Sequence, residues 1–368
     1  MTKKKAMPRA PARNAAKNRT SPSAKGAARV FVSLTPAKTS EVFDTYWHFA
    51  AKRQEVFFAR LEGKPKPWTD DPILNEYKFT NAYRASDRVS QYLIRNVIYR
   101  GPQESEDVFF RTLLFKLFNK IETWELLESQ LGGIRRESFR YADYDRVLSR
   151  AMNSNVTIYS AAYIMASGGK IFGVQRKHQS HLKLIELMLA EFVPERLKDC
   201  STMRGAFELL RAYPLIGDFL AYQLVTDFNY STLTDFSEME FTMPGPGALD
   251  GIRKCFSTLG GLAAGDIIRL MADRQEYEFE RLGLSFKNLW GRRLQLIDIQ
   301  NLFCEADKYA RVKHPNIAGI SGRTRIKQRF AETHASINYF YPPKWGLKLP
   351  EQAIAIDSKT RQRDLFQN

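Results

Sequence analysis

The sequence predicts an all-α protein with low strand content, and three observations support this fold class. Apolar residues recur at helical spacing in successive stretches from about residue 39 onward, whereas runs with the two-residue period of a strand are rare. Clusters of glycine and proline separate these stretches. Of the 368 residues, 44% are hydrophobic, which is enough to form a buried core. Because a single core rarely exceeds roughly 250–300 residues, we expect one large helical domain or two interlocked lobes.

The chain divides into three parts by composition. Residues 1–38 form a basic tail, residues 39–345 a helical domain, and residues 346–368 a C-terminal extension with a polar end. The tail is rich in Ala, Pro, Ser and Lys and cannot bury a core, so we expect it to be disordered. Its role is open between a DNA-binding arm, a nuclear address, an organellar transit peptide and a solubilising tail.

Helices are expected in order along the domain. The first runs from about residue 39 to 61, because Thr39-Ser40-Glu41-Val42 offers a cap ahead of apolar residues, and the proline-broken stretch 63–72 follows as a loop. The remaining helices are predicted at 75–99, 106–128, 141–151, 178–192, 203–212, 217–227, 247–259, 264–282 and 294–312.

Two regions are less regular. Residues 155–175 are ambiguous, since 156–159 fits either a short strand or a helix start, and 167–170 is a turn. The region after Pro315 is punctuated by glycine and proline and closes with an aromatic cluster. That cluster consists of Tyr339, Phe340, Tyr341 and Trp345.

The charge of the chain indicates an acidic partner. The formal net charge is +16, and residues 1–40 carry ten basic residues and no acidic one. Phosphate backbones are the commonest acidic partners of such proteins, and their attraction depends on salt. DNA is therefore the expected partner, with a basic protein that binds no polyanion as the alternative.

Several metal, cofactor and membrane signals are missing from the sequence. Its three cysteines are widely spaced with no CxxC, and neither HExxH nor the phosphate-binding GxxxxGK[ST] occurs. His178 and His181 share a helix face, but two ligands are a weak zinc signal and we expect surface histidines. We expect no metal, no evident cofactor and an intracellular protein with reduced thiols. No apolar run approaches the roughly 18 residues of a membrane span.

A helical hairpin is expected around Gly217. Residues 213–221, YPLIGDFLA, have the layout of a helix, a tight glycine turn and a second helix. In a helix-hairpin-helix element such a turn directs free backbone N–H groups at a phosphate. An ordinary αα-hairpin, with glycine chosen for positive φ, fits equally well.

Three carboxylates precede a loop of alternating proline and glycine. Asp235, Glu238 and Glu240 come just before Pro244-Gly245-Pro246-Gly247, which opens a helix. Its first turns carry Asp250, Arg253 and Lys254. Bare amides beside acids suit a site that holds a phosphate and performs acid–base chemistry. In the simpler interpretation Asp250 stabilises the helix dipole and the other acids are solvated.

Two predicted helices carry polar stripes. On the first, Asn81, Arg84 and Arg88 share a face that fits a nucleic-acid backbone or, equally, water, and Lys78 begins the helix. On the helix at 294–312 one side is polar. It carries Asp298, Asn301, Glu305 and Lys308. This second stripe suits either a pocket or a solvated surface with a Glu305–Lys308 pair.

Four long strings carry a family resemblance. They are KPWTDDPILNEYKFTNAYRASDRVSQYLIRNVIY, EDVFFRTLLFKLFNKIETWELLE, PGPGALDGIRKCF and LQLIDIQNLFCEADKYARV. They resemble the helical domain of 5-hydroxymethyluracil DNA kinases, a family of DNA base hypermodification proteins similar in outline to the α-glutamyl/putrescinyl-thymine pyrophosphorylases. The resemblance covers about residues 40–345. It implies a DNA-glycosylase-like helical fold with a helix-hairpin-helix element, acting on a thymine-derived base that must first leave the base stack.

The leading hypothesis is a DNA-binding protein of thymine hypermodification that acts on an extruded base. Glu238 and Glu240 are the first catalytic candidates, followed by Asp235, Asp298 and Glu305. Contacts to DNA are expected from eleven residues. These are Lys78, Asn81, Arg84, Arg88, Gly217, Gly245, Gly247, Arg253, Lys254, Asn301 and Lys308.

Two alternatives stay open. One is a DNA glycosylase that excises a modified base. The other is a non-catalytic DNA-binding module that works with a separate kinase or transferase, since the family's nucleotide-binding loop is missing from this chain.

Overall fold

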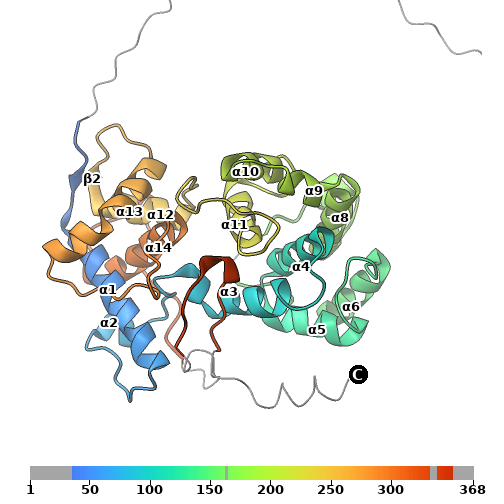
Figure 1. Cartoon of the computed structure of the whole chain (residues 1–368), viewed down its shortest axis with the longest axis horizontal. Coiled ribbons are helices and arrows are strands. Elements are labelled where there is room, and N and C mark those ends of the chain that lie inside the picture. The colour runs from blue at the N-terminus through green and yellow to red at the C-terminus, as the bar shows by residue number, and fades with distance from the viewer. Residues whose placement is uncertain (1–34, 162–164, 332–337, 351–368) are drawn as a thin grey trace, which may run out of the picture. The chain divides into compact units, whose positions relative to one another are not determined.

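The computed structural model describes residues 35–161, 165–331 and 338–350, and it confirms the all-α fold class. These residues form fourteen α-helices and one two-stranded sheet (Figure 1). Residues from Pro36 onward belong to one compact unit. The predicted basic tail lies outside the described residues except for its last four positions, and most of the predicted C-terminal extension lies outside them as well.

The elements follow one another in this order. They are β1 (Lys38–Thr39), α1 (Glu41–Leu61), α2 (Pro72–Glu76), η1 (Arg84–Ser86), α3 (Arg88–Tyr92), η2 (Leu93–Ile98), α4 (Ser105–Phe118), α5 (Ile121–Leu131), α6 (Tyr141–Asn153), α7 (Gly169–Phe172), α8 (Lys177–Ala190), α9 (Val193–Lys198), α10 (Met203–Arg211), α11 (Asp218–Phe228), α12 (Pro246–Cys255), β2 (Phe256–Thr258), α13 (Ala264–Arg281), α14 (Leu296–Lys313) and η3 (Pro343–Trp345).

One group of helices consists of α1, α12, α13 and α14, which pack on one another. Ser40 caps α1, with its hydroxyl oxygen accepting the N–H of Val42 at 3.1 Å, as the sequence predicts. Inside the group, the ring of Tyr46 lies 4.7 Å from that of Phe303. Helices α12 and α14 cross so closely that a Cβ at Gly251 would lie 2.1 Å from the carbonyl oxygen of Phe303. Only glycine permits this crossing.

A second group surrounds α4, which contacts η2, α5, α8, α9 and α11. Almost the whole circumference of α4 is buried, because its residues 108–118 all face protein. The ring of Phe109 stacks on that of Phe228 of α11 at 5.0 Å. Figure 1 shows α3 lying between the labels of the two groups, and the chain segment 77–92 joins them.

The largest difference from the predicted helices concerns residues 77–87. We expected a helix over 75–99, but regular α-helix begins only at Arg88. Backbone N–H groups of the segment are bound elsewhere: Lys78 donates to the carbonyl oxygen of Gln328 at 3.0 Å, and Thr80 to the carboxylate of Glu305 at 2.9 Å. Because these long-range partners take the amides, the apolar spacing does not produce a helix there.

Other differences are smaller. The single helix predicted over 106–128 is two helices, since Asn119 adopts a left-handed φ of 49° at the end of α4. The helix predicted to run to residue 259 ends at Cys255, and β2 then pairs with β1 in antiparallel register. Short helices α2, α7 and α9 were not predicted. Residues 156–159 form neither a strand nor a helix.

Candidate functional site

A buried polar cluster lies where the two helix groups meet, and Arg84 is at its centre. The side chain of Arg84 is 5% exposed. Its Nη2 donates to Asp227 at 2.6 Å, its Nη1 to the hydroxyl of Tyr230 at 2.9 Å, and its Nε to Gln223 at 3.2 Å. Lys116 contacts the other carboxylate oxygen of Asp227 at 2.9 Å. We call these five residues the Arg84 cluster.

Asp298 joins the Arg84 cluster from the first turn of α14. One carboxylate oxygen accepts the backbone N–H of Arg84 at 2.8 Å, and the other accepts that of Gln295 at 3.0 Å. Burial raises the pKa of Asp298 to about 6, against the opposing effect of these two hydrogen bonds. The positive charge of Arg292 also lowers this pKa, whereas the negative charge of Glu238 raises it.

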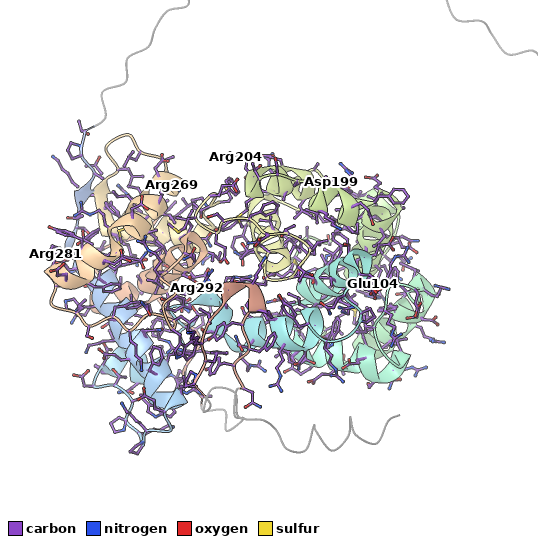
Figure 2. All side chains as sticks on the ribbon, viewed as in Figure 1. Glu104, Asp199, Arg204, Arg269, Arg281 and Arg292 are labelled. Atoms are coloured by element: carbon purple, nitrogen blue, oxygen red, sulfur yellow. The ribbon has the colours of Figure 1, made fainter. Side chains whose placement is uncertain are left out.

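Glu238 and Arg292 form a second buried pair beside Asp298. Arg292 Nη2 donates to Glu238 at 2.6 Å, and the guanidinium lies 3.6 Å above the ring of Trp345 (Figure 2 labels Arg292). The Trp345 ring packs edge-on against Tyr230 of the Arg84 cluster, at 5.6 Å. Trp345 of η3 thus links the Glu238–Arg292 pair to the Arg84 cluster, and Asp298 is joined to that cluster through the backbone of Arg84.

This arrangement can support proton transfer. Glu238 is held by a guanidinium, while burial raises the pKa of Asp298 to about 6. Two carboxyl groups with different surroundings can divide the roles of acid and base between them. Perturbed acids beside a specific charge partner are typical of functional sites, although structural ion pairs also produce them.

The five predicted catalytic carboxylates do not lie together. Glu238 and Asp298 meet at the junction, but the side chain of Asp235 is 89% exposed and contacts Lys344 at 3.3 Å. Glu240 is exposed and accepts the N–H of Met203 at 3.1 Å, which caps α10. Glu305 accepts the N–H of Thr80 and pairs with Lys308 at 2.7 Å. A catalytic role stays a prediction for all five.

Two residues that we predicted to contact DNA, Arg84 and Lys254, have buried side chains. Arg84 is buried in its cluster, and Lys254 is 1% exposed and pairs with Asp307 at 3.0 Å. The sequence pattern misled because Arg84 does not lie on the expected helix. Lys78, Arg88 and Arg253 are exposed.

The remaining predicted contacts vary in their surroundings. Asn81 accepts a hydrogen bond from Arg53 at 2.6 Å, and Asn301 and Lys308 are half-buried on α14. A Cβ at Gly245 would lie 2.7 Å from the Phe219 ring, and one at Gly247 3.0 Å from Cys304 Sγ. Gly245 is therefore closely packed against Phe219, and Gly247 packs tightly against Cys304.

Helices α10 and α11 form the expected hairpin, with residues 212–217 as the turn. The residue with positive φ is Leu215, at 68°, and not Gly217. Gly217 is the N-cap of α11 in extended conformation, and a Cβ there would meet no atom within 4 Å. The backbone N–H groups at the start of α11 are thus approachable from outside.

The two histidines and a pocket at the start of α4 lie away from the junction. His178 and His181 are buried, contrary to our expectation of surface residues. His178 contacts Asp145 at 2.7 Å, and His181 contacts the hydroxyl of Tyr159 at 2.8 Å.

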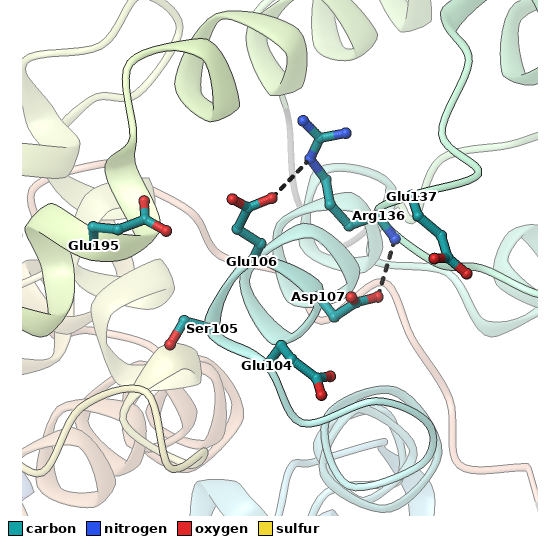
Figure 3. A pocket seen from close by; sticks show the side chains of 7 residues that line it. All are labelled: Glu104, Ser105, Glu106, Asp107, Arg136, Glu137 and Glu195. Carbon is teal, nitrogen blue, oxygen red and sulfur yellow. Dashed lines mark hydrogen bonds and ion pairs between the residues drawn. The ribbon is translucent and has the colours of Figure 1, made fainter.

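A pocket at the start of α4 is mainly acidic (Figure 3). It is lined by Glu104, Ser105, Glu106, Asp107, Arg136, Glu137 and Glu195. Five carboxylates against one guanidinium disfavour a phosphate ligand.

Within residues 35–161, 165–331 and 338–350, no group of three or more His, Cys, Asp or Glu side chains could hold a metal ion. In the same part of the chain, no helix is long and apolar enough to cross a membrane.

Sequence reasoning missed Arg292, Tyr230 and Trp345, although each contacts the candidate site. It also missed a compositional signal. Residues 308–331 hold seven Lys and Arg and no acidic residue.

Comparisons with known proteins agree with the helical fold. A family model described as "5-hmdU DNA kinase, helical domain" matches residues 40–319. A curated relative, the 5-hmdU DNA kinase of Bacillus phage SP10, is 27% identical over 296 residues, which is 74% of this chain and 46% of the relative. The chain thus spans less than half the length of that kinase. No solved structure matches.

Proposed function

We propose, from the premise that this chain belongs to the family of 5-hmdU DNA kinase helical domains, that it binds DNA and acts on 5-hydroxymethyluracil there. The family match covers most of the chain, and the related phage protein is named for this modified nucleoside. A base inside a duplex is out of reach of a buried carboxylate, so it must leave the stack, at a cost of a few kcal/mol. The junction between the two helix groups is the proposed destination.

The observation that carries this proposal is the pairing of Glu238 with Arg292 next to Asp298. In a transfer to the 5-hydroxymethyl group, the hydroxyl oxygen forms a new bond to phosphorus. The bond from phosphorus to the leaving nucleoside diphosphate breaks, and a carboxylate takes the hydroxyl proton. Glu238 is the proposed acceptor, and Asp298, with its pKa of about 6, is the proposed second acid.

The phosphate donor would be held elsewhere. The sequence contains no GxxxxGK[ST], and the curated kinase is more than twice as long as the part that matches this chain. We therefore propose that a nucleotide-binding domain outside these residues, such as that of a kinase or transferase partner, supplies the donor site. The start of α11, as a helix-hairpin-helix element, and the basic N-terminal residues would hold DNA phosphates.

Glu238 and Glu240 offer a matched test, because they lie two residues apart and only Glu238 lies at the junction. The substrate is duplex DNA with 5-hydroxymethyluracil, incubated with a nucleoside triphosphate and an extract of cells that contain the partner. Mass spectrometry of the nucleosides measures the product. We expect Glu238→Gln to lower conversion at least about 100-fold, the usual range for a general base, and Glu240→Gln to retain most of it. Equal conversion by both variants would remove Glu238 from the mechanism.

The same assay separates the alternatives. Release of free base with abasic sites would favour a glycosylase. Binding without any product, under all partner conditions, would favour a non-catalytic DNA-binding module.

A further inference from the structure

A basic segment follows the last long helix and pairs as a strand around Arg329. Residues 322–331 contain no helix, and the segment is fixed at its end to the chain before η1. Tyr77 and Arg329 form an antiparallel bridge, and the N–H of Phe330 donates to the carbonyl oxygen of Glu76 at 2.9 Å. Arg311 of α14 donates to the carbonyl oxygen of Arg325 at 3.0 Å. The segment is therefore held against the protein at two places, by α14 at Arg325 and by the chain before η1 at Arg329 and Phe330.

Four cations alternate along this segment, and we call them the cationic strip. They are Arg323, Arg325, Lys327 and Arg329. In an extended chain, residues two apart point to the same face and lie about 6.6 Å from each other. All four are exposed, whereas Ile326 between them packs on the core. Thr324 and Gln328 are exposed as well, so Ile326 alone marks the side of the segment that faces the protein.

The acids near the cationic strip neutralise only its ends. Arg329 contacts Glu76 at 3.1 Å with its side chain still 76% exposed. Arg323 lies close enough to lower the pKa of Asp250, whose carboxylate accepts hydrogen bonds from Ser321. In the part of the chain that the structure describes, neither Arg325 nor Lys327 has an ion-pair partner, and exposed Lys78 adds a further charge beside Gln328.

We propose that the cationic strip binds the sugar–phosphate backbone of DNA beside the base that reaches the junction, a role that rests on the function proposed above. A row of evenly spaced, exposed cations complements a row of phosphates and carries no base specificity. Lys78 precedes Arg84 by six residues, which span at most about 20 Å. The proposal places the strip on the same DNA duplex as the base that approaches Glu238.

The test compares two triple variants of the full chain with equal loss of charge. Arg323→Gln, Arg325→Gln and Lys327→Gln remove three of the four cations of the cationic strip. Arg146→Gln, Arg150→Gln and Lys198→Gln remove three exposed cations from α6 and α9. Binding to a short labelled DNA duplex of unmodified sequence is titrated at several salt concentrations, and thermal unfolding checks that both variants are folded.

We expect the slope of log K against log salt to shrink by about 2.7 for the strip variant, from about 0.9 per phosphate contact. When the salt concentration rises fourfold, both proteins lose affinity. The factor by which the strip variant loses affinity should be about 40 times smaller than the factor for the unchanged protein. The control variant should keep the original slope.

Each other outcome overturns the inference. Equal slopes for the two variants would mean that only net charge matters, and an unchanged slope in the strip variant would place the DNA elsewhere, with the proposed function intact. If the unchanged protein does not bind DNA at all, the proposed function fails together with the strip.

Discussion

The Arg84 cluster and the cationic strip use the same residue types in opposite ways. In the cluster, Arg84 and Lys116 are buried around one carboxylate, Asp227. In the strip, Arg325 and Lys327 are exposed on an extended segment. Buried charges are fixed in geometry and cannot be removed singly without a large penalty, whereas exposed charges contribute little to stability. The comparison teaches that stability and DNA binding should depend on different basic residues.

The largest expected effect comes from breaking the Arg84 cluster. Asp227→Ala leaves Arg84 and Lys116 buried without their shared carboxylate, so we expect the free energy of unfolding to fall by about 3–5 kcal/mol. Urea denaturation measures the change. The matched variant is Asp235→Ala, because the side chain of Asp235 is 89% exposed and its loss should cost about 0.5 kcal/mol or less. A similar fall in the free energy of unfolding for both variants would show that the burial of these charges does not determine their contribution to stability.

A second pair of variants compares a buried and an exposed cation that are neighbours on α12. Lys254→Ala removes a buried partner of Asp307, whereas Arg253→Ala removes an exposed cation next to it. Because Asp307 keeps Arg311 as a partner, we expect Lys254→Ala to cost about 3 kcal/mol, the lower end for a broken buried pair. Arg253→Ala should leave stability within about 0.5 kcal/mol. Chemical denaturation of the two variants under the same conditions measures both changes in stability. Equal changes would contradict the prediction.

The smallest effect concerns pH and the acid at the junction. Burial raises the pKa of Asp298 to about 6, so the folded protein binds this proton more tightly than the unfolded chain, where the pKa is near 3.8. The stability that the proton contributes is present below pH 4 and is lost as pH rises to about 6, by up to about 3 kcal/mol. Asp298→Asn has no such titration. Its stability relative to the unchanged protein should therefore rise between pH 4 and 6 and stay level above; a flat difference throughout would contradict the raised pKa.

Long amphipathic helices were predictable from the sequence, and parts of the site were not. The boundaries predicted for α1, α13 and α14 agree with the structure to within two residues, because apolar spacing and caps are local signals. The segment before Arg84 was misread, since its amides bind Glu305 and Gln328, which lie over 200 residues away. Local patterns contain no information about such partners.

The site itself shows the same limit. Glu238 and Asp298 were named from acids near a loop and on a helix face, but Arg292 and Trp345 are joined to them only by the fold. The cationic strip is different, because its alternation and lack of acids are visible in the sequence. Reading that stretch with a two-residue period would have found it.

The missing side chain at Gly251 also has a consequence for how DNA can be held. It lets α12 and α14 touch along their backbones at this point, with no side chain between them. Asp250 on α12 fastens Ser321, from which the basic segment departs, and α14 presents Asp298. The place where a strand would be held and the place where a base would react therefore both depend on this one crossing, which is too tight to admit a methyl group.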